Sequence, residues 1–276
     1  MLQRAKNFLQ DFTSEVLSPA FGQFRYIWRF FVKPAVIRNR GIRLVARHPV
    51  ISPYMRIILY RDRYERPELQ ILEKTLAPDD RVLELGGGVG FISTYSARKC
   101  GDESVTVVEA NPALAPLIAE NHRLNGVHPT VINAAATLDD RETETFYVTK
   151  DFWAGSTQAH EAERVTVPAL NANALIADLD PTYLIIDIEG AETELVPALD
   201  FGNVKKLLIE LHPHASGITA ANEVIPQLFM KGFAIDMAYS IRNNFFMVRT
   251  DEHEIVERSL DAARIESSRS GAASNA

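Results

Sequence analysis

Short apolar runs and longer stretches of mixed polarity follow one another along this chain, above all from residue 81 onward. Each apolar run is long enough for one buried strand, and most of the stretches between them have the spacing of a helix. The predicted strands cover Arg81–Leu85, Ser104–Val108, Thr130–Asn133, Thr143–Val148, Arg164–Leu170, Thr182–Ile188, Val204–Leu211, Phe233–Ala238 and Asn244–Val248. Strands that alternate with helices in this way predict an α/β fold, in which helices cover both faces of a mainly parallel sheet.

Helices are predicted between these strands and before the first one. One follows the first strand and ends near Lys99, and the others cover Glu68–Leu76, Pro112–Asn125, Ala191–Leu199 and Ala220–Lys231. We therefore divide the chain into three parts. These are a basic, aromatic helical extension (residues 1–66), the alternating domain (residues 67–250), and a C-terminal helix with a disordered tail (residues 251–276).

The N-terminal extension combines an aromatic stripe with positive charge. Its helical spacing of three and four is set by Phe21, Phe24, Trp28 and Phe31. Residues 1–66 hold 13 Lys and Arg against 4 Asp and Glu, whereas the rest of the chain holds 16 against 32. Three interpretations of the aromatic stripe stay open: packing on the following domain, contact with an anionic membrane surface, or contact with another subunit. The acidic body argues against nucleic acid as a partner.

Composition narrows the class of protein further. Hydrophobic residues make up 46% and charged residues 24% of the 276 residues, which excludes wholesale disorder. The one cysteine, Cys100, excludes an internal disulfide framework and a multi-cysteine metal site. No membrane span and no secretory signal are expected from the pattern. We therefore expect a cytoplasmic protein, and peripheral contact with the inner membrane surface stays open for the N-terminal extension.

The most informative stretch is a glycine-rich turn after the first strand of the domain. It has the pattern E-x-G-x-G-x-G, made by Glu84, Gly86, Gly88 and Gly90. Glycines allow a tight turn and the close approach of a ligand. The dinucleotide pattern G-x-G-x-x-G is not satisfied, because its third glycine falls on Phe91. Glu84 disfavours a pyrophosphate, so S-adenosyl-L-methionine, with its ammonium and sulfonium groups, fits this turn better than NAD.

The next strand of the domain ends in a second acidic residue, Glu109, 19 residues after Gly90. A carboxylate at this place can accept hydrogen bonds from both hydroxyl groups of a ribose. The alternative is a tight strand–helix connection with a solvated Glu109. The joint placement of Glu84 and Glu109 favours the nucleoside site.

A further acidic group follows the predicted strand Thr182–Ile188. Asp187 and Glu189 come at its carboxyl end, where open α/β folds bind ligands. Asp187 is the first candidate for a general base toward a hydroxyl acceptor, with Glu189 and His212 behind it. Glu210 and His212 share one side of a later strand, so they could also form an oxygen and nitrogen metal site with Asp187 and Glu189. We assign no metal.

Together these elements resemble the FkbM family of S-adenosylmethionine-dependent methyltransferases, from about Val82 to His212. The resemblance is carried by the glycine-rich turn, Glu109-Ala110-Asn111-Pro112, Asn121 to Asn125, Asn133-Ala134-Ala135, Asp187 to Glu192 and Ile209 to His212. It implies a Rossmann-like fold and S-adenosyl-L-methionine as cofactor. The implied cofactor residues are Glu84, Gly86, Gly88 and Gly90 at the methionine end, Glu109 and Ala110 at the ribose, Asn133 and Ala134 near the adenine, and Asp187 at the border with the acceptor.

Two positions depart from the family pattern. Many members have Asp where this chain has Asn171, and often Asp where it has Glu84. From the resemblance we expect methyl transfer to a hydroxyl group of a sugar, a glycan or a small metabolite. Two alternatives stay open: a non-catalytic scaffold protein that binds the cofactor, and a NAD-dependent oxidoreductase.

Overall fold

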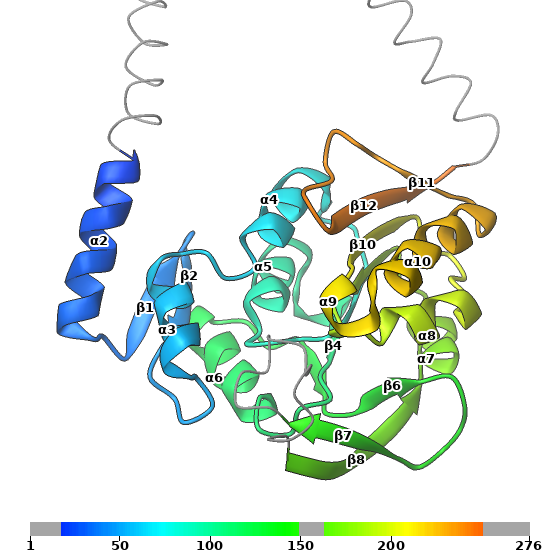
Figure 1. Cartoon of the computed structure of the whole chain (residues 1–276), viewed down its shortest axis with the longest axis horizontal. Coiled ribbons are helices and arrows are strands. Elements are labelled where there is room, and N and C mark those ends of the chain that lie inside the picture. Colours follow the sequence, from blue (N-terminus) through cyan, green and yellow to red (C-terminus); the bar gives the residue numbers. More distant parts are fainter. Residues whose placement is uncertain (1–17, 149–162, 251–276) are drawn as a thin grey trace, which may run out of the picture.

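The computed structural model describes residues 18–148 and 163–250 of the chain. Its centre is a seven-stranded sheet with helices on both faces (Figure 1). The strands of this sheet are β3 (Val82–Leu85), β4 (Val105–Val108), β5 (Thr130–Ile132), β9 (Tyr183–Ile186), β10 (Lys206–Glu210), β11 (Phe233–Ile235) and β12 (Asn244–Arg249). The predicted Rossmann-like α/β fold is confirmed, since each of these strands overlaps a segment predicted from its apolar residues.

The order of the strands across the sheet is β11-β12-β10-β9-β3-β4-β5. The strands from β10 to β5 run parallel, and β12 runs antiparallel to both of its neighbours. A dinucleotide-binding sheet has the order 3-2-1-4-5-6. Here the first five strands keep that order, but the last strand is inserted between the fifth and the sixth. The direction of winding reverses between β3 and β9, which makes their carboxyl ends the place where such folds bind ligands.

Residues on the central strands alternate between two hydrophobic cores, one on each face of the sheet. The helices over the two faces include α5 (Phe91–Cys100), α6 (Ala115–Asn125), α7 (Ala172–Leu179), α8 (Glu192–Ala198) and α10 (Ile218–Met230). Val82 and Tyr183 belong to the core under α5 and α6. Leu83 and Leu184 belong to the core under α7, α8 and α10. Because both faces are buried, the central strands are almost entirely apolar, with Glu84 in β3 and Thr106 in β4 as exceptions, and this made them detectable in the sequence.

The residues before the sheet contribute to the first of these cores. They form α2 (Ser18–Val32), β1 (Val36–Asn39), β2 (Ile42–Val45), α3 (Pro53–Tyr60) and α4 (Arg66–Thr75). Leu44 of the β1–β2 hairpin and Met55 of α3 are buried in the same cluster as Phe91 of α5. The hydrophobic core therefore continues across the boundary expected at residue 66. Neither this hairpin nor α3 was predicted from the sequence.

Two asparagines that contribute to the family resemblance connect the β1–β2 hairpin to α6. The Val45 N–H donates to Asn121 Oδ1 at 2.8 Å, and Asn121 Nδ2 donates to the Val89 carbonyl at 2.8 Å. Asn125 binds both the N–H and the carbonyl of Arg43, at 2.8 and 2.7 Å. In this chain the two side chains hold segments of backbone together, away from the cavity described below.

The structure differs from the sequence prediction at two helices, one that begins later than predicted and one that was not predicted. The helix expected from Pro112 begins only at Ala115, because Asn111 first turns the chain by accepting the Ala113 N–H at 3.0 Å. Helix α7 was not predicted. It is capped by Asn171, whose side chain accepts backbone N–H groups at 3.0 and 3.2 Å. Asp caps helices as well as Asn does, which gives this departure from the family pattern a structural explanation.

A smaller sheet and a short helix complete the described part of the chain. The sheet has the order β6-β8-β7 and consists of β6 (Ala135–Thr137), β7 (Thr143–Val148) and β8 (Glu163–Asn171), and the short helix is α9 (Pro213–Ser216). The predicted C-terminal helix and tail, residues 251–276, lie outside the described residues. No helix among those described is both long enough and apolar enough to cross a membrane.

Candidate functional site

A cavity of about 620 Å³ opens at the carboxyl ends of β3, β4, β9 and β10. It therefore lies at the reversal of winding between β3 and β9. The predicted site residues that line it are Gly86, Gly88, Glu109, Ala110, Ala134, Asp187, Glu189 and His212. Glu84, Gly90 and Asn133 were also predicted but are not among the residues that line the cavity. The structure thus brings most of the predicted cofactor and acceptor residues into one space.

The glycine-rich turn approaches two other segments more closely than side chains would permit. Gly86 has a φ of +94°, and a Cβ there would stand 1.7 Å from the carbonyl oxygen of Asp187. A Cβ at Gly88, where φ is +51°, would stand 2.3 Å from the hydroxyl oxygen of Tyr64. The two glycines are therefore required by the packing of the protein itself, in addition to leaving room for a ligand.

Glu109, at the end of β4, fixes the turn from one side. Its carboxylate accepts the N–H of Gly88 at 2.9 Å and that of Asn111 at 2.7 Å. Burial raises the pKa of Glu109 to about 7, although these backbone hydrogen bonds oppose the shift. Because Glu109 also lines the cavity, its oxygens are placed to accept further hydrogen bonds from the hydroxyl groups of a nucleoside.

The three predicted residues that do not line the cavity, Glu84, Gly90 and Asn133, lie behind its wall. Glu84 is 2% exposed, and burial, followed by the charges of Glu65 and Glu109, raises the pKa of Glu84 well above its ordinary value. A Cβ at Gly90 would stand 3.0 Å from a side chain of α6, so this glycine allows α5 to pack closely on α6. Asn133 donates its side-chain amide to the Glu109 carbonyl at 2.7 Å. These residues shape the cavity wall without facing the cavity.

Tyr64 and Glu65, which the sequence did not single out, line the cavity opposite the glycine-rich turn. The Val89 N–H donates to the Tyr64 hydroxyl oxygen at 3.2 Å, and this hydroxyl also hydrogen-bonds the Glu65 carboxylate. Burial raises the pKa of Glu65 to about 8, against the effect of that hydrogen bond. The only nearby signal in the sequence is Pro67, which marks a helix start and not a site.

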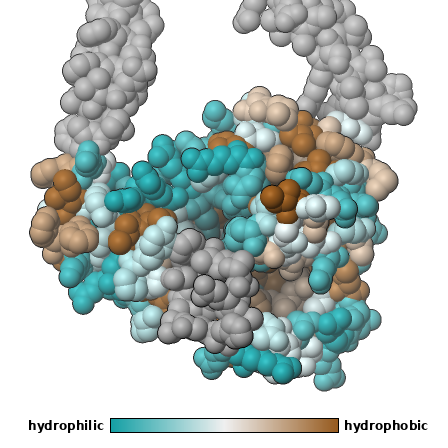
Figure 2. All heavy atoms as spheres, in the orientation of Figure 1, coloured by the Kyte–Doolittle hydropathy of each residue, from teal (hydrophilic) through white to brown (hydrophobic). Residues whose placement is uncertain are grey.

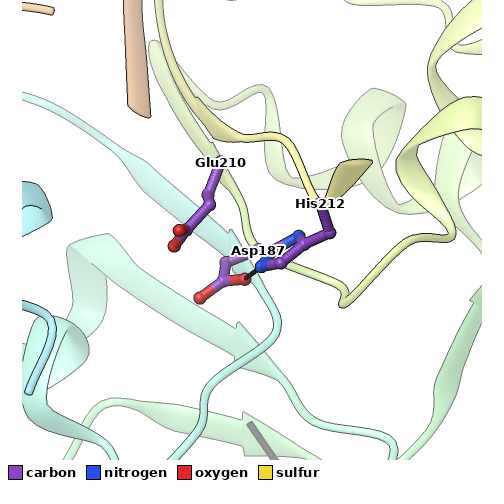
Figure 3. Close-up of side chains that lie close together, drawn as sticks. All are labelled: Asp187, Glu210 and His212. Atoms are coloured by element: carbon purple, nitrogen blue, oxygen red, sulfur yellow. Dashed lines mark ion pairs between the residues drawn. The ribbon is translucent and has the colours of Figure 1, made fainter. Parts of the chain in front are cut away.

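At the other end of the cavity, His212 is surrounded by carboxylates and points toward Asp187 (Figure 3). Its Nδ1–H donates to Glu192 Oε1 at 2.9 Å. Its Nε2 lies 3.4 Å from Asp187 Oδ1 and 3.5 Å from Glu189 Oε2. Burial lowers the pKa of His212, but the hydrogen bond to Glu192 and the charges of Glu189 and Glu192 outweigh it, so the pKa is raised overall.

The carboxyl groups at this end influence one another. Burial raises the pKa of Asp187 well above its ordinary value, and the charges of Glu210 and Glu189 raise it further. The pKa of Glu68 is also raised well above its ordinary value, first by burial and then by a hydrogen bond shared with Glu210. A carboxyl group with a raised pKa is a stronger base in its charged form.

The same end has the donor atoms of a metal site. Asp187, Glu210 and His212 offer one ligand atom each, and these atoms lie within 4.8 Å of one another. Two carboxylate oxygens with one imidazole nitrogen suit a borderline divalent metal such as Mn²⁺, Fe²⁺ or Zn²⁺ better than Mg²⁺, which prefers oxygen ligands alone. The hydrogen bond from His212 Nδ1 to Glu192 is the arrangement that orients either a metal-binding or a proton-accepting imidazole. The cluster can therefore take up a proton or hold a divalent metal ion.

No family model and no curated protein matches the chain. Among solved structures, it is 15% identical to a ribosomal protein L11 methylase from Lactobacillus delbrueckii subsp. bulgaricus, over 67% of this chain and 77% of that one, with a TM-score of 0.41. It is 13% identical to a precorrin-6y C5,15-methyltransferase from Geobacter metallireducens, over 67% and 86%, with a TM-score of 0.41. It is 14% identical to Trm1 from Pyrococcus horikoshii, solved with S-adenosyl-L-methionine, over 80% of this chain and 63% of that one, with a TM-score of 0.43. At such low identities and TM-scores, these likenesses carry no weight for the function of this chain.

Proposed function

We propose that this chain is an S-adenosyl-L-methionine-dependent methyltransferase. The supporting observation is one end of the cavity, where a glycine-rich turn meets buried carboxyl groups. Glu65 and Glu109 border this end and Glu84 lies behind it, and burial raises the pKa of all three. A cationic ligand relieves the repulsion among such groups and favours their charged forms. The ammonium and sulfonium groups of S-adenosyl-L-methionine are cations of the right kind.

The same features argue against a NAD-dependent oxidoreductase. The third glycine of a dinucleotide turn is replaced by Phe91, which is fully buried in the core and unable to face a pyrophosphate. Glu65 would lie near that doubly negative group. The antiparallel β12 also departs from the sheet order of dinucleotide-binding domains.

When bound, S-adenosyl-L-methionine supplies an electrophilic methyl group, which an acceptor displaces in line from its sulfur. The chain holds the acceptor in the cavity beside the ends of β9 and β10, and this positioning is its largest contribution to rate. A hydroxyl acceptor also loses its proton as its oxygen is methylated. Asp187 takes up this proton, because its carboxylate lines the cavity and its raised pKa makes it a stronger base. His212 Nε2 lies 3.4 Å from this carboxylate and orients it toward the cavity.

The acceptor in this proposal is a hydroxyl group of a sugar, a glycan or a small metabolite. Beyond Asp187 the cavity is lined by groups that donate and accept hydrogen bonds, namely Glu210, His214, Arg242, Asn243 and Asn244. Several such groups can hold a molecule that carries several hydroxyl groups. The resemblance of the sequence to the FkbM family favours the same class of acceptor. The cytoplasm is the proposed location.

Calorimetry on the folded protein tests the proposal. S-adenosyl-L-methionine and its demethylated product S-adenosylhomocysteine are expected to bind, and NADH is not. Mass spectrometry of the molecules released from denatured protein should detect the same nucleosides. Absence of heat with both nucleosides would refute the proposal. Tight binding without turnover on any acceptor, unchanged by Asp187→Asn, would instead support the scaffold protein.

A further inference from the structure

Glu65 lies outside the part of the chain that resembles the methyltransferase family, yet its carboxylate faces the glycine-rich turn. A Cβ added to Gly88 would stand 2.8 Å from Glu65 Oε1. The other oxygen, Oε2, is buried and has no hydrogen-bond partner among the described residues. Such an oxygen raises the free energy of the folded chain unless a ligand satisfies it.

The backbone at Glu65 is strained as well. Its φ of 42° and ψ of 35° are in the left-handed region, which favours glycine over glutamate. The Tyr64 hydroxyl, which caps the Val89 N–H at 3.2 Å, holds the Glu65 carboxylate in place. The chain therefore keeps a strained acidic residue whose one buried oxygen is left for a cation.

We propose that Glu65 binds the α-ammonium group of the methionine portion of S-adenosyl-L-methionine, an inference that rests on the proposed function. Glu109 lies at the end of β4, where the ribose is expected, and Glu65 lies across the turn at Gly88. The methionine portion then extends along the turn toward Glu65. An ammonium group donates three hydrogen bonds and can satisfy the buried Oε2.

Calorimetry with three ligands distinguishes this contact from the other contacts of the site. S-adenosyl-L-methionine and S-adenosylhomocysteine both carry the ammonium group, and 5′-methylthioadenosine lacks the whole amino acid part. Glu65→Gln should weaken the first two by about 10- to 100-fold and leave the third within about 2-fold. Glu65→Gly should weaken the same two ligands by a similar factor. Because glycine accepts the positive φ, this variant should stay folded. Glu73→Gln, on the solvent side of the same helix, is the matched control and should leave all three affinities unchanged.

The outcomes of this calorimetry separate the inference from the proposed function. Unchanged affinity of Glu65→Gln for S-adenosyl-L-methionine overturns the role of Glu65 alone. An equal loss of affinity for all three ligands overturns the ammonium contact, because the substitution would then disturb the whole binding site and not the methionine end alone. A wild-type protein that binds none of the three overturns the proposed function and this inference with it.

A separate observation concerns α2, whose charged face is turned inward. Arg29 is 4% exposed and donates to the Tyr60 carbonyl at 2.9 Å, to Asp62 Oδ1 at 2.7 Å and to the Arg38 carbonyl at 2.7 Å. Arg25 also pairs with Asp62. The exposed side chains on the opposite face, here called the α2 surface, are Phe24 (69%), Ile27 (46%), Trp28 (50%) and Phe31 (77%). This exposure contradicts the interpretation in which the aromatic stripe packs on the domain.

Charge favours one occupant of the α2 surface. Figure 2 shows apolar residues gathered at the edge of the molecule over α2. Arg25 of the same helix and Lys33, which follows its last residue, are exposed basic residues. The residues after 66 carry the excess of negative charge, so an anionic surface would attract the α2 end and repel the rest. Aromatic residues flanked by Lys and Arg are typical of helices that lie in the interface of a bilayer.

We propose that the α2 surface binds an anionic lipid bilayer. In a flotation experiment, the protein should rise with vesicles of phosphatidylcholine and phosphatidylglycerol, and far less with phosphatidylcholine alone. The combined change Phe24→Ser, Trp28→Ser and Phe31→Ser should reduce binding by about tenfold or more. Phe229→Ser with Met230→Ser, exposed apolar residues of α10, is the matched control and should bind as the wild type does.

Two results would overturn this second proposal. One is equal flotation of the wild type and the triple variant with anionic vesicles. The other is a dimer, detected by light scattering, that the triple variant abolishes while vesicle binding is absent. That result would show that a second copy of the chain covers the α2 surface.

Discussion

The two ends of the cavity are built from different parts of the chain. At the end formed by β3 and β4, backbone dominates: the glycine-rich turn touches Asp187 and Tyr64 at distances that only glycine permits. At the end formed by β9 and β10, side chains dominate: His212 is held between Glu192, Asp187 and Glu189. The first end therefore tolerates almost no added atom, whereas the chemistry of the second end depends on the charge and protonation of its side chains.

The largest expected effect is at the backbone end. Gly86→Ala places a Cβ 1.7 Å from the Asp187 carbonyl oxygen, so the two segments have to separate. We expect a loss of more than about 4 kcal/mol in the free energy of unfolding, or no folded protein at all. Urea denaturation measures it. Gly126→Ala is the control, because Gly126 also has a positive φ but nothing within 4 Å, and it should cost about 1 kcal/mol. Similar losses at both positions would contradict the close approach.

At the side-chain end, a change of charge should affect turnover and leave cofactor affinity nearly intact. Asp187→Asn removes the proton acceptor while keeping its shape, so kcat should fall by about 10²- to 10⁴-fold. The Kd for S-adenosyl-L-methionine should stay within about 3-fold, as measured by calorimetry. Glu194→Gln, on the exposed side of α8, is the control for kcat. A loss of affinity as large as the loss of kcat would place Asp187 at the cofactor end instead.

The carboxyl groups at the cofactor end should make binding depend on pH. The pKa values of Glu65 and Glu109, about 8 and about 7, lie above the ordinary 4.5, so both groups hold protons at pH 6 in the free protein. Binding of a cation releases these protons, so affinity should rise from pH 6 to about pH 8, by at most about tenfold per pH unit for each proton released, and level off above the pKa of Glu65. Calorimetry in buffers of different ionisation enthalpy counts the protons. An affinity that does not change with pH would contradict this.

The same shifts have a consequence for the cofactor-free protein. Because the folded-state pKa values of Glu65 and Glu109 exceed the ordinary ones, the folded state binds more protons than the unfolded state between about pH 4.5 and pH 8. Their contribution to stability is complete below pH 4.5 and is lost as the pH rises through 7 and 8. Urea denaturation of Glu109→Gln should show a weaker loss over this window than the wild type.

The smallest expected effect is at Asn171, which does not line the cavity. Asn171→Ala should cost about 1 kcal/mol of unfolding free energy, because it removes the cap of α7. Asn171→Asp keeps the cap but sets a second carboxylate beside Asp140 in place of the donated amide, so it should also be destabilising, by less than about 1 kcal/mol. Neither change should alter the Kd for the cofactor. A clear change in Kd would give this position a role in binding.

The sequence predicted the backbone end better than the side-chain end, for physical reasons. The glycine-rich turn and Glu109 follow directly from apolar strands, so their place at the sheet edge can be deduced from local pattern alone. Glu65 could not be found in this way, because it reaches the cavity only when α4 packs across the sheet. Nor does any local pattern show that Glu192 orients His212, 20 residues further along the chain. Helix α7 was missed because β8 runs into it at Asn171 without an intervening turn.

The buried hairpin before the sheet has a practical consequence for anyone who shortens this chain. A fragment that starts at residue 67, the limit of the alternating pattern, would lose Leu44 and Met55 from the core and Tyr64 and Glu65 from the cavity wall. Its expression would test a damaged molecule and not a minimal domain. Truncations that keep residues 18–66 leave the core and the wall complete, together with Arg29, which ties α2 to Tyr60, Asp62 and Arg38.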